Sequence, residues 1–157
     1  MTQGLLASEQ SLEQELEPAR IRGVVEAALA PFAPLRRVLL LHPDYSRTDF
    51  THTLFGMIYA TLAARGLQRI DTLNAAGTHR AMTLEEKMAK LGIADRAAFP
   101  ALGELADHSV APSELVEAGT LPAAFMGEKT QGRWAEAIPI KVNRRLREPY
   151  DLIIGIS

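Results

Sequence analysis

Two short polar clusters contain residue types that could bind a ligand or catalyse a reaction. The first, Asp44-Tyr45-Ser46-Arg47, combines a carboxylate, a hydroxyl and a guanidinium. The planar guanidinium of Arg47 suits a carboxylate or phosphate that is held by two hydrogen bonds. Composition alone allows a second interpretation, in which Asp44 starts a turn and caps a helix while the arginine is solvated.

The second cluster is Gly77-Thr78-His79-Arg80. Glycine lets the backbone approach a ligand closely, and the helix expected to follow offers its amino end to an anion. His79 could act as a general acid or base because its unperturbed pKa lies near neutrality. A single histidine in a loop is more often a surface residue. Two clusters at equivalent places in consecutive strand–helix units favour the functional interpretation of both.

Several other chemistries lack their sequence signatures. The chain has no GxxxxGK[ST] phosphate loop, GxGxxG fingerprint, HExxH helix or GxSxG elbow. His42, His52, His79 and His108 do not follow a metal-binding spacing, and cysteine is absent. The absence of cysteine excludes disulfides, thiolate metal sites and cysteine nucleophiles. We therefore predict no complete metal site in this chain.

Strands and helices that alternate along the chain must position the two clusters. The pattern predicts a mostly parallel, Rossmann-like α/β sheet with flanking helices, because each apolar run is followed by a helical period. Both clusters follow expected strands, at the sheet edge where α/β proteins place their sites, so we expect Asp44, Arg47 and His79 to converge at the carboxyl edge of one parallel sheet. The elements expected in this half are a helix from Pro18 to before Pro31, a strand over 37–42, a helix over 51–65, a strand over 69–75 and a capped helix from Thr83 to near Gly92. We expect the strand over 69–75 to be less buried at its polar positions.

The second half of the chain is less regular. The sequence of this half predicts a short element within 99–110, an irregular excursion over 120–132, an edge strand over 138–143 and a final strand over 150–156. We expect a flexible terminal arm over 1–17 and one α/β domain over 18–157. Because the last apolar strand is followed by almost nothing, we expect a domain truncated from a larger two-domain enzyme.

Bulk composition narrows the possible partners. The hydrophobic fraction of 47% and the charged fraction of 23% are typical of a globular protein. A net charge of −2 argues against nucleic acid as a partner. No apolar run is long enough to predict a membrane span, and no signal peptide is recognisable. A chain without cysteine is consistent with the cytoplasm.

The two clusters, in this order and spacing, resemble motifs of the lactate racemase family. Asp44-Tyr45-Ser46-Arg47 is similar to the family's Asp-x-Thr-Arg loop, and Gly77-Thr78-His79-Arg80 to its Gly-x-His-Arg loop. The resemblance runs from about Val38 to the end and covers the amino-terminal domain. Weaker matches are Met82 to Glu86, Asp107 to Ser109, Ile140 to Arg144 and Tyr150 to Ile154.

This resemblance implies a racemase or epimerase that inverts the carbon of a 2-hydroxy acid by hydride transfer to a nickel-pincer nucleotide. It implies that His79 is the acid/base toward the substrate hydroxyl and that Arg47 steadies the substrate. The residues implied to line the cofactor are Asp44, Ser46, Thr78 and Arg80. In the family, the cofactor-bearing lysine and the nickel-ligating histidine lie beyond Ser157, and Lys141 stands in a different context. We therefore expect this fragment alone to be inactive and to bind no cofactor.

Departures from the family pattern bear on the substrate. Ser46 replaces the usual threonine but keeps the hydroxyl, whereas Thr48 and Ala81 stand where the family commonly has proline. The expected partners are a small 2-hydroxy acid and the carboxyl-terminal remainder of the enzyme. Two alternatives stay open: a non-catalytic ligand- or anion-binding module of the same fold, and an enzyme that acts on a larger sugar acid.

Overall fold

The computed structural model of the protein describes residues 7–10, 16–32 and 34–156, which form two compact units. The first unit comprises the described residues up to Ala75, together with Met82–Asp107 and the residues from Tyr150 onward. The second comprises Ala76–Ala81 and His108–Pro149. The predicted terminal arm, 1–17, lies partly outside the described residues; residues 7–10 and 16–17 belong to no helix or strand.

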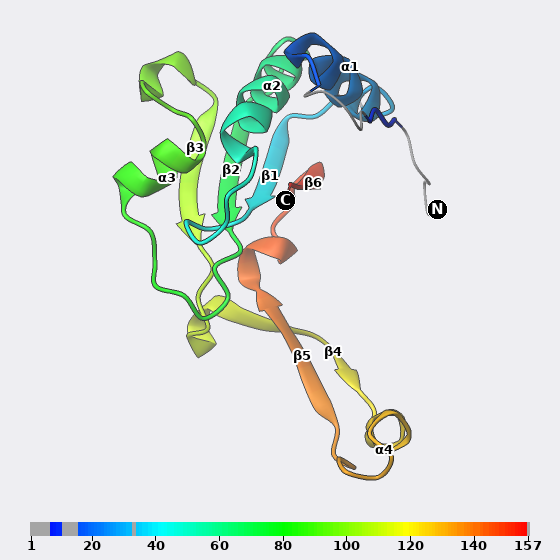
Figure 1. Ribbon diagram of the computed structural model, residues 1–157. Coiled ribbons are helices and arrows are strands. Elements are labelled where there is room, and N and C mark those ends of the chain that lie inside the picture. Colours follow the sequence, from blue (N-terminus) through cyan, green and yellow to red (C-terminus); the bar gives the residue numbers. More distant parts are fainter. Residues whose placement is uncertain (1–6, 11–15, 33, 157) are drawn as a thin grey trace. The chain divides into compact units, whose positions relative to one another are not determined.

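The first unit is a parallel α/β sheet, as the sequence predicts. Its four strands lie in the order β3-β2-β1-β6, and every neighbouring pair is parallel (Figure 1). The elements of this unit are α1 (Pro18–Leu29), β1 (Arg37–His42), α2 (Thr51–Ala63), β2 (Arg69–Asn74), α3 (Leu84–Lys90), the 3-10 turn Arg96–Ala98, β3 (Leu102–Asp107) and β6 (Leu152–Gly155).

Strand β1 is buried on both faces, which explains its continuous run of branched apolar residues. Val38, Leu39 and Leu40 are all fully shielded from solvent. Val38 and Leu40 belong to the main core, where α1, α2 and the end of α3 cover one face of the sheet. Burying such a side chain contributes roughly 1.5–3 kcal/mol relative to leaving it exposed. Phe55 and Phe99 complete this core, with ring centroids 5.5 Å apart.

The helix ends follow the signals in the sequence. Thr83 caps α3, and its hydroxyl accepts from the Glu86 amide while the Glu86 carboxylate accepts from the Thr83 amide. This reciprocal pair satisfies amide groups that the first turn of a helix leaves unbonded. After α2, Gly66 adopts a φ of +88°, a backbone conformation that glycine adopts without strain. Both predicted boundaries are confirmed.

The polar positions of β2 correct the sequence-based expectation. We expected them to be less buried, but Asp71, Thr72 and Asn74 are each at most 1% exposed. The expectation was wrong because β2 lies between β1 and β3, so neither of its edges is free. Polar side chains in such a strand require partners within the fold.

Asp71 obtains those partners from several strands. Its carboxylate accepts hydrogen bonds from Arg69 Nε (2.9 Å), from the Glu104 amide (2.7 Å) and from the Tyr150 hydroxyl (3.1 Å). Burial alone would raise the pKa of Asp71, but these hydrogen bonds outweigh it and hold the pKa below its usual value. Gly103 is required beside it, because a Cβ there would lie 2.2 Å from Asp71 Oδ1.

The second unit contains elements that the sequence did not reveal. β4 (Leu115–Leu121) pairs antiparallel with β5 (Ile138–Asn143), and α4 (Ala123–Lys129) lies between them in the chain. Two 3-10 turns, Pro112–Glu114 and Arg144–Arg147, flank the strands. The predicted strand over 138–143 is confirmed, but the excursion over 120–132 contains a regular helix. At seven residues, α4 is too short to show a clear helical period.

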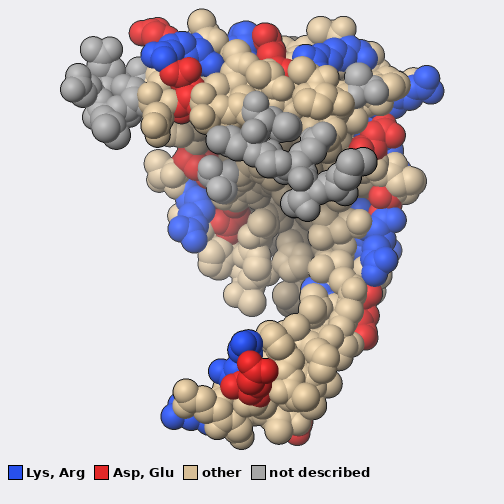
Figure 2. Space-filling model, turned by 90° about the vertical axis from the view of Figure 1, so that its right-hand side faces the viewer, with Lys and Arg blue, Asp and Glu red and all other residues tan. Residues whose placement is uncertain are grey.

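The described surface carries mixed charge. Figure 2 shows one face of the molecule, on which basic and acidic side chains are interspersed. No helix in the described part of the chain is long and apolar enough to cross a membrane.

Replacing Asp71 with Asn should lower the free energy of unfolding by roughly 1–3 kcal/mol, because an amide group cannot accept all the hydrogen bonds that the buried carboxylate accepts. Urea denaturation followed by circular dichroism measures this change. The control is Glu85→Gln on the exposed first turn of α3, expected to change stability by no more than about 0.5 kcal/mol. Equal effects of the two substitutions would show that Asp71 does not hold the sheet together.

Candidate functional site

Three neighbouring strands end on polar residues that lie in register. His42 of β1 is paired with Asn74 of β2, and Asn74 is paired with Asp107 of β3. The Asn74 side-chain amide donates to the Asp107 carboxylate, while Asn74 Oδ1 is buried and has no hydrogen-bond partner among the described residues. This row forms the carboxyl edge of the sheet, where α/β proteins bind ligands.

His42 is a neutral member of this edge. It is 2% exposed, and its Nδ1 atom donates to the Pro43 carbonyl at 2.8 Å. Burial lowers the pKa of His42, and the nearby Lys90 ammonium lowers it further. The imidazole is therefore uncharged near neutral pH and acts as a packed hydrogen-bonding group.

The first predicted loop is a turn that begins at Asp44. This side chain is 3% exposed, and its Oδ1 atom accepts from the Ser46 amide at 3.1 Å and from the Ser46 hydroxyl at 2.6 Å. Arg47 lies next in the chain and is exposed. The geometry matches the alternative interpretation of an Asp-initiated turn, and it also presents Arg47 toward solvent. Asp44 and Ser46 therefore shape the loop that carries the guanidinium.

Lys90 of α3 also binds the loop that carries Arg47. Its Nζ atom donates to the Arg47 carbonyl at 2.7 Å and to Asp49 Oδ2 at 2.7 Å. Asp49 also accepts from the Thr51 amide at 2.8 Å. Partial burial would raise the pKa of Asp49, but the hydrogen bonds from Lys90 and Thr51 hold the pKa at about 2.

The second predicted loop contains a tight turn of its own. The His79 amide donates to the Ala76 carbonyl at 2.9 Å, and Gly77 inside the turn has a φ of +59°. Thr78, His79 and Arg80 are all exposed. These three side chains therefore lie at the solvent-accessible surface.

Asp107 binds the residues on either side of that loop. It accepts from the Asn74 side chain before the loop and from the Met82 amide after it, the latter at 3.0 Å. Lys87 of α3 forms an ion pair with Asp107 and donates to the Leu105 carbonyl at 3.0 Å. The ends of the loop are therefore fixed on the first unit.

The predicted site residues fall in both units. Asp44, Ser46 and Arg47 belong to the first, whereas Thr78, His79 and Arg80 belong to the second. The two loops start at the ends of the adjacent strands β1 and β2. Convergence of Arg47 and His79 on one ligand stays a prediction.

Sequence reasoning missed the supporting residues Asn74, Lys87 and Lys90, and it noted Asp107 only within a weak family match. A usable signal was present, because Asn74 and Asp107 are the last residues of their strands. Aligning the expected strands by their ends would have brought both to the same edge as His42. The lysines gave no such signal, since exposed helices often carry them.

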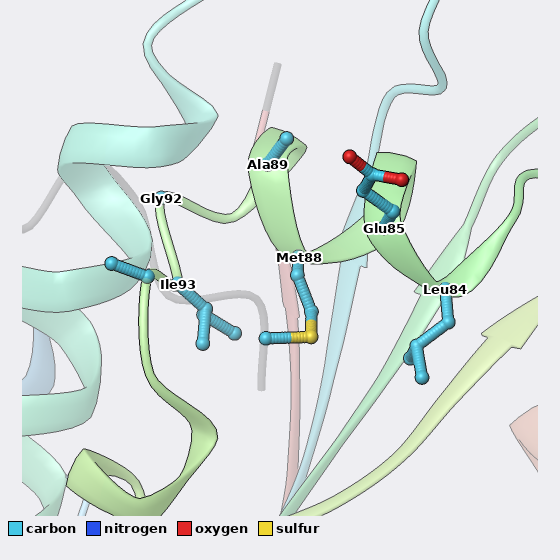
Figure 3. Close-up of a pocket in the computed structure, with 7 residues that line it drawn as sticks. Leu84, Glu85, Met88, Ala89, Gly92 and Ile93 are labelled. Atoms are coloured by element: carbon cyan, nitrogen blue, oxygen red, sulfur yellow. The ribbon is translucent and has the colours of Figure 1, made fainter.

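A metal-binding cluster and a surface depression are two other kinds of candidate site. Among the described residues, no three His, Asp or Glu side chains are grouped to hold a metal ion. A depression of about 770 Å³ runs along α3 and the residues after it, and Figure 3 shows Leu84, Met88 and Ile93 on its wall. Glu85 is the one titratable group among the residues that line it, so this depression does not resemble a catalytic site.

Two comparisons found proteins to which this chain is similar. The family model of the lactate racemase N-terminal domain matches residues 7–128. One solved structure, a crystal structure of a protein from Thermotoga maritima, is 39% identical with a TM-score of 0.80. The match covers 89% of this chain and 33% of that one, so the chain spans about a third of that protein's length. No curated protein matches the sequence.

The pKa of Asp49 leads to a pH-dependent prediction. Because this pKa is lowered from 3.8 to about 2, the charged carboxylate stabilises the fold fully above about pH 5. This contribution is lost as the pH falls through about 4 toward 2. The stability difference between wild type and Asp49→Asn should therefore be constant at neutral pH and shrink in acid. Urea denaturation at several pH values measures it; a difference that persists unchanged to about pH 2.5 would contradict the assignment.

Proposed function

The chain belongs to the family of lactate racemase N-terminal domains, and we propose that it is the amino-terminal part of a racemase or epimerase that inverts the carbon of a 2-hydroxy acid. The observation that carries this proposal is the family match over residues 7–128, which spans both polar loops. The exposed Arg47 and His79 side chains support it. We further propose that the enzyme acts in the cytoplasm.

His79 is the proton-transfer group in this proposal. Its imidazole takes the proton from the 2-hydroxyl, so the O–H bond breaks and the electron pair stays on oxygen. That negative charge favours departure of the hydrogen on the adjacent carbon as a hydride. Return of hydrogen to the opposite face, with return of the proton from His79 to oxygen, inverts the centre.

Arg47 binds the substrate carboxylate. Its guanidinium can donate two parallel hydrogen bonds to the two carboxylate oxygens, which fixes both the position and the orientation of a small acid. The hydrogen-bonded turn of Asp44 and Ser46 supports this role, because it limits the conformations of the backbone from which Arg47 projects. A pre-ordered arginine loses less entropy when the substrate binds.

A nickel-pincer nucleotide would supply the hydride acceptor when bound. We propose that Thr78 and Arg80 contact it directly, since both are exposed, and that Asp44 and Ser46 fix the adjoining loop. No group among the described residues could hold the nickel ion. We propose, from the resemblance to the family, that the nickel ligands and the cofactor-bearing lysine lie in other parts of a longer protein.

The two compact units are proposed to work as one domain over 18–157. The family match runs continuously from the first unit into the second, and the chain passes from Ala75 of the first unit through the His79 turn of the second and back to Met82 of the first. The solved relative is about three times as long as this chain. The remainder of such a protein is the proposed partner of this domain.

The proposed function predicts distinct effects of His79 and Arg47 in a full-length protein. His79→Ala should lower kcat by roughly 10²–10⁴, because it removes a proton-transfer group, and should leave the melting temperature unchanged because the side chain is exposed. Arg47→Lys should mainly raise KM, since the charge is kept but the bidentate fork is lost. Optical rotation of lactate and longer 2-hydroxy acids measures both constants.

The matched control is His52→Ala, which removes an exposed histidine on α2 and should leave both constants unchanged. A wild-type rate for His79→Ala on every accepted substrate would contradict the catalytic role. Binding of 2-hydroxy acids without turnover would favour the ligand-binding module. Preference for longer polyhydroxy acids would instead indicate an enzyme for sugar acids.

A further inference from the structure

Helix α3 carries two lysines whose side chains are unusually enclosed. The side chains of Lys87 and Lys90 are 13% and 12% exposed, whereas lysine is rarely buried unless it is paired. Their partners Asp107 and Asp49 are similarly enclosed, at 17% and 11%. Removing an ammonium from such a pair leaves a carboxylate without a countercharge, so these pairs differ from ordinary surface ion pairs.

The Lys90 ammonium binds main-chain and side-chain atoms of the first loop together. It donates to the carbonyl of Arg47 and to the carboxylate of Asp49, two residues further along. Asp49 in turn accepts from the first amide of α2, that of Thr51. The backbone at Arg47 is therefore held from both sides, by the Asp44 turn before it and by α3 behind it.

The Lys87 ammonium acts on the second loop through Asp107. Asp107 binds Asn74, the last residue of β2, and Met82, the residue after the loop. These bonds close the ends of the segment 75–81, which contains His79. Met82 directly precedes Thr83, the cap of α3, so the same helix also sets where the loop ends.

We propose that α3 is a positioning element, in which Lys90 with Asp49 fixes the loop of Arg47 and Lys87 with Asp107 fixes the ends of the loop of His79. The catalytic meaning of this arrangement rests on the proposed function, but the arrangement itself does not. Lys87 and Lys90 are positioning residues, because Lys90 binds atoms of the first loop and Lys87 binds atoms of β3. The competing explanation is that the two pairs only stabilise the fold.

The two lysines provide matched controls for each other in the 157-residue chain. In Lys90→Met, amide hydrogen exchange at Ser46, Arg47 and Thr51 should rise about tenfold, since each charged hydrogen bond contributes more than an ordinary one. Exchange at Met82 should stay within about threefold. In Lys87→Met the pattern should reverse. Exchange measured by nuclear magnetic resonance resolves these amides individually.

Two milder substitutions keep the test decisive if a methionine variant unfolds. Lys90→Arg keeps donors for both acceptors and should restore protection of the first loop. Asp49→Asn keeps the size of the side chain and should loosen only that loop. Equal increases at both loops and at the core amides of β1 would overturn the proposal, because they indicate a loss of global stability. Unchanged exchange in both methionine variants would overturn it as well.

Kinetics of the full-length protein link the positioning to the function. Lys90→Met should lower kcat/KM for lactate by about tenfold, mainly through KM, and Lys90→Arg should recover most of it. A loosened loop without a kinetic effect would overturn the catalytic meaning of the arrangement. A wild-type protein that racemises no 2-hydroxy acid would contradict the proposed function, while the selective exchange pattern would still establish the positioning role.

Discussion

The carboxylate of Asp71 lies in the middle of the sheet, where almost no solvent reaches it, and its charge must be compensated by protein groups. Those groups come from every strand of the first unit. Arg69 belongs to β2, as Asp71 does. The Glu104 amide belongs to β3, and the Tyr150 hydroxyl belongs to the segment that leads into β6. The Nη2 atom of Arg37, in β1, lies 3.7 Å from Asp71 Oδ2. Since a buried carboxylate without partners costs several kcal/mol, the strands are held in one register.

The same register also aligns the residues at the carboxyl end of the sheet. With Leu39 beside Asp71, the last residues of β1 and β2 are His42 and Asn74, and the loops that follow start side by side. The loop residues then need only local support, which the Asp44 turn and the lysines of α3 provide. The buried charge of Asp71 thus lies toward the amino-terminal end of β2, whereas the candidate ligand-binding groups follow the carboxyl edge of the sheet.

Sequence patterns were sufficient where one short segment carries the whole signal. The apolar run of β1, the capping pair Thr83 and Glu86 and the two polar loops are of this kind. They were insufficient where a residue's partner is distant, as for Asp71 and Tyr150, which are 79 positions apart. Burial of Asn74 and the contacts of Lys90 depend on how strands and helices pack. In the second unit, β4 and α4 are short and contain no buried apolar residue, so no periodic pattern marks them.

The hydrogen bonds that support the loops involve main-chain atoms. Lys90 binds the carbonyl of Arg47, Lys87 binds the carbonyl of Leu105 in β3, and Asp107 binds the amide of Met82. A main-chain carbonyl is present whatever side chain the residue carries. Mutations at Arg47 or its neighbours can therefore alter the recognised ligand while the scaffold behind the loop persists. Relatives with this arrangement can diverge in specificity through single substitutions, and the positions least free to vary are Lys87, Lys90 and their two aspartates, which bind one another as ion pairs.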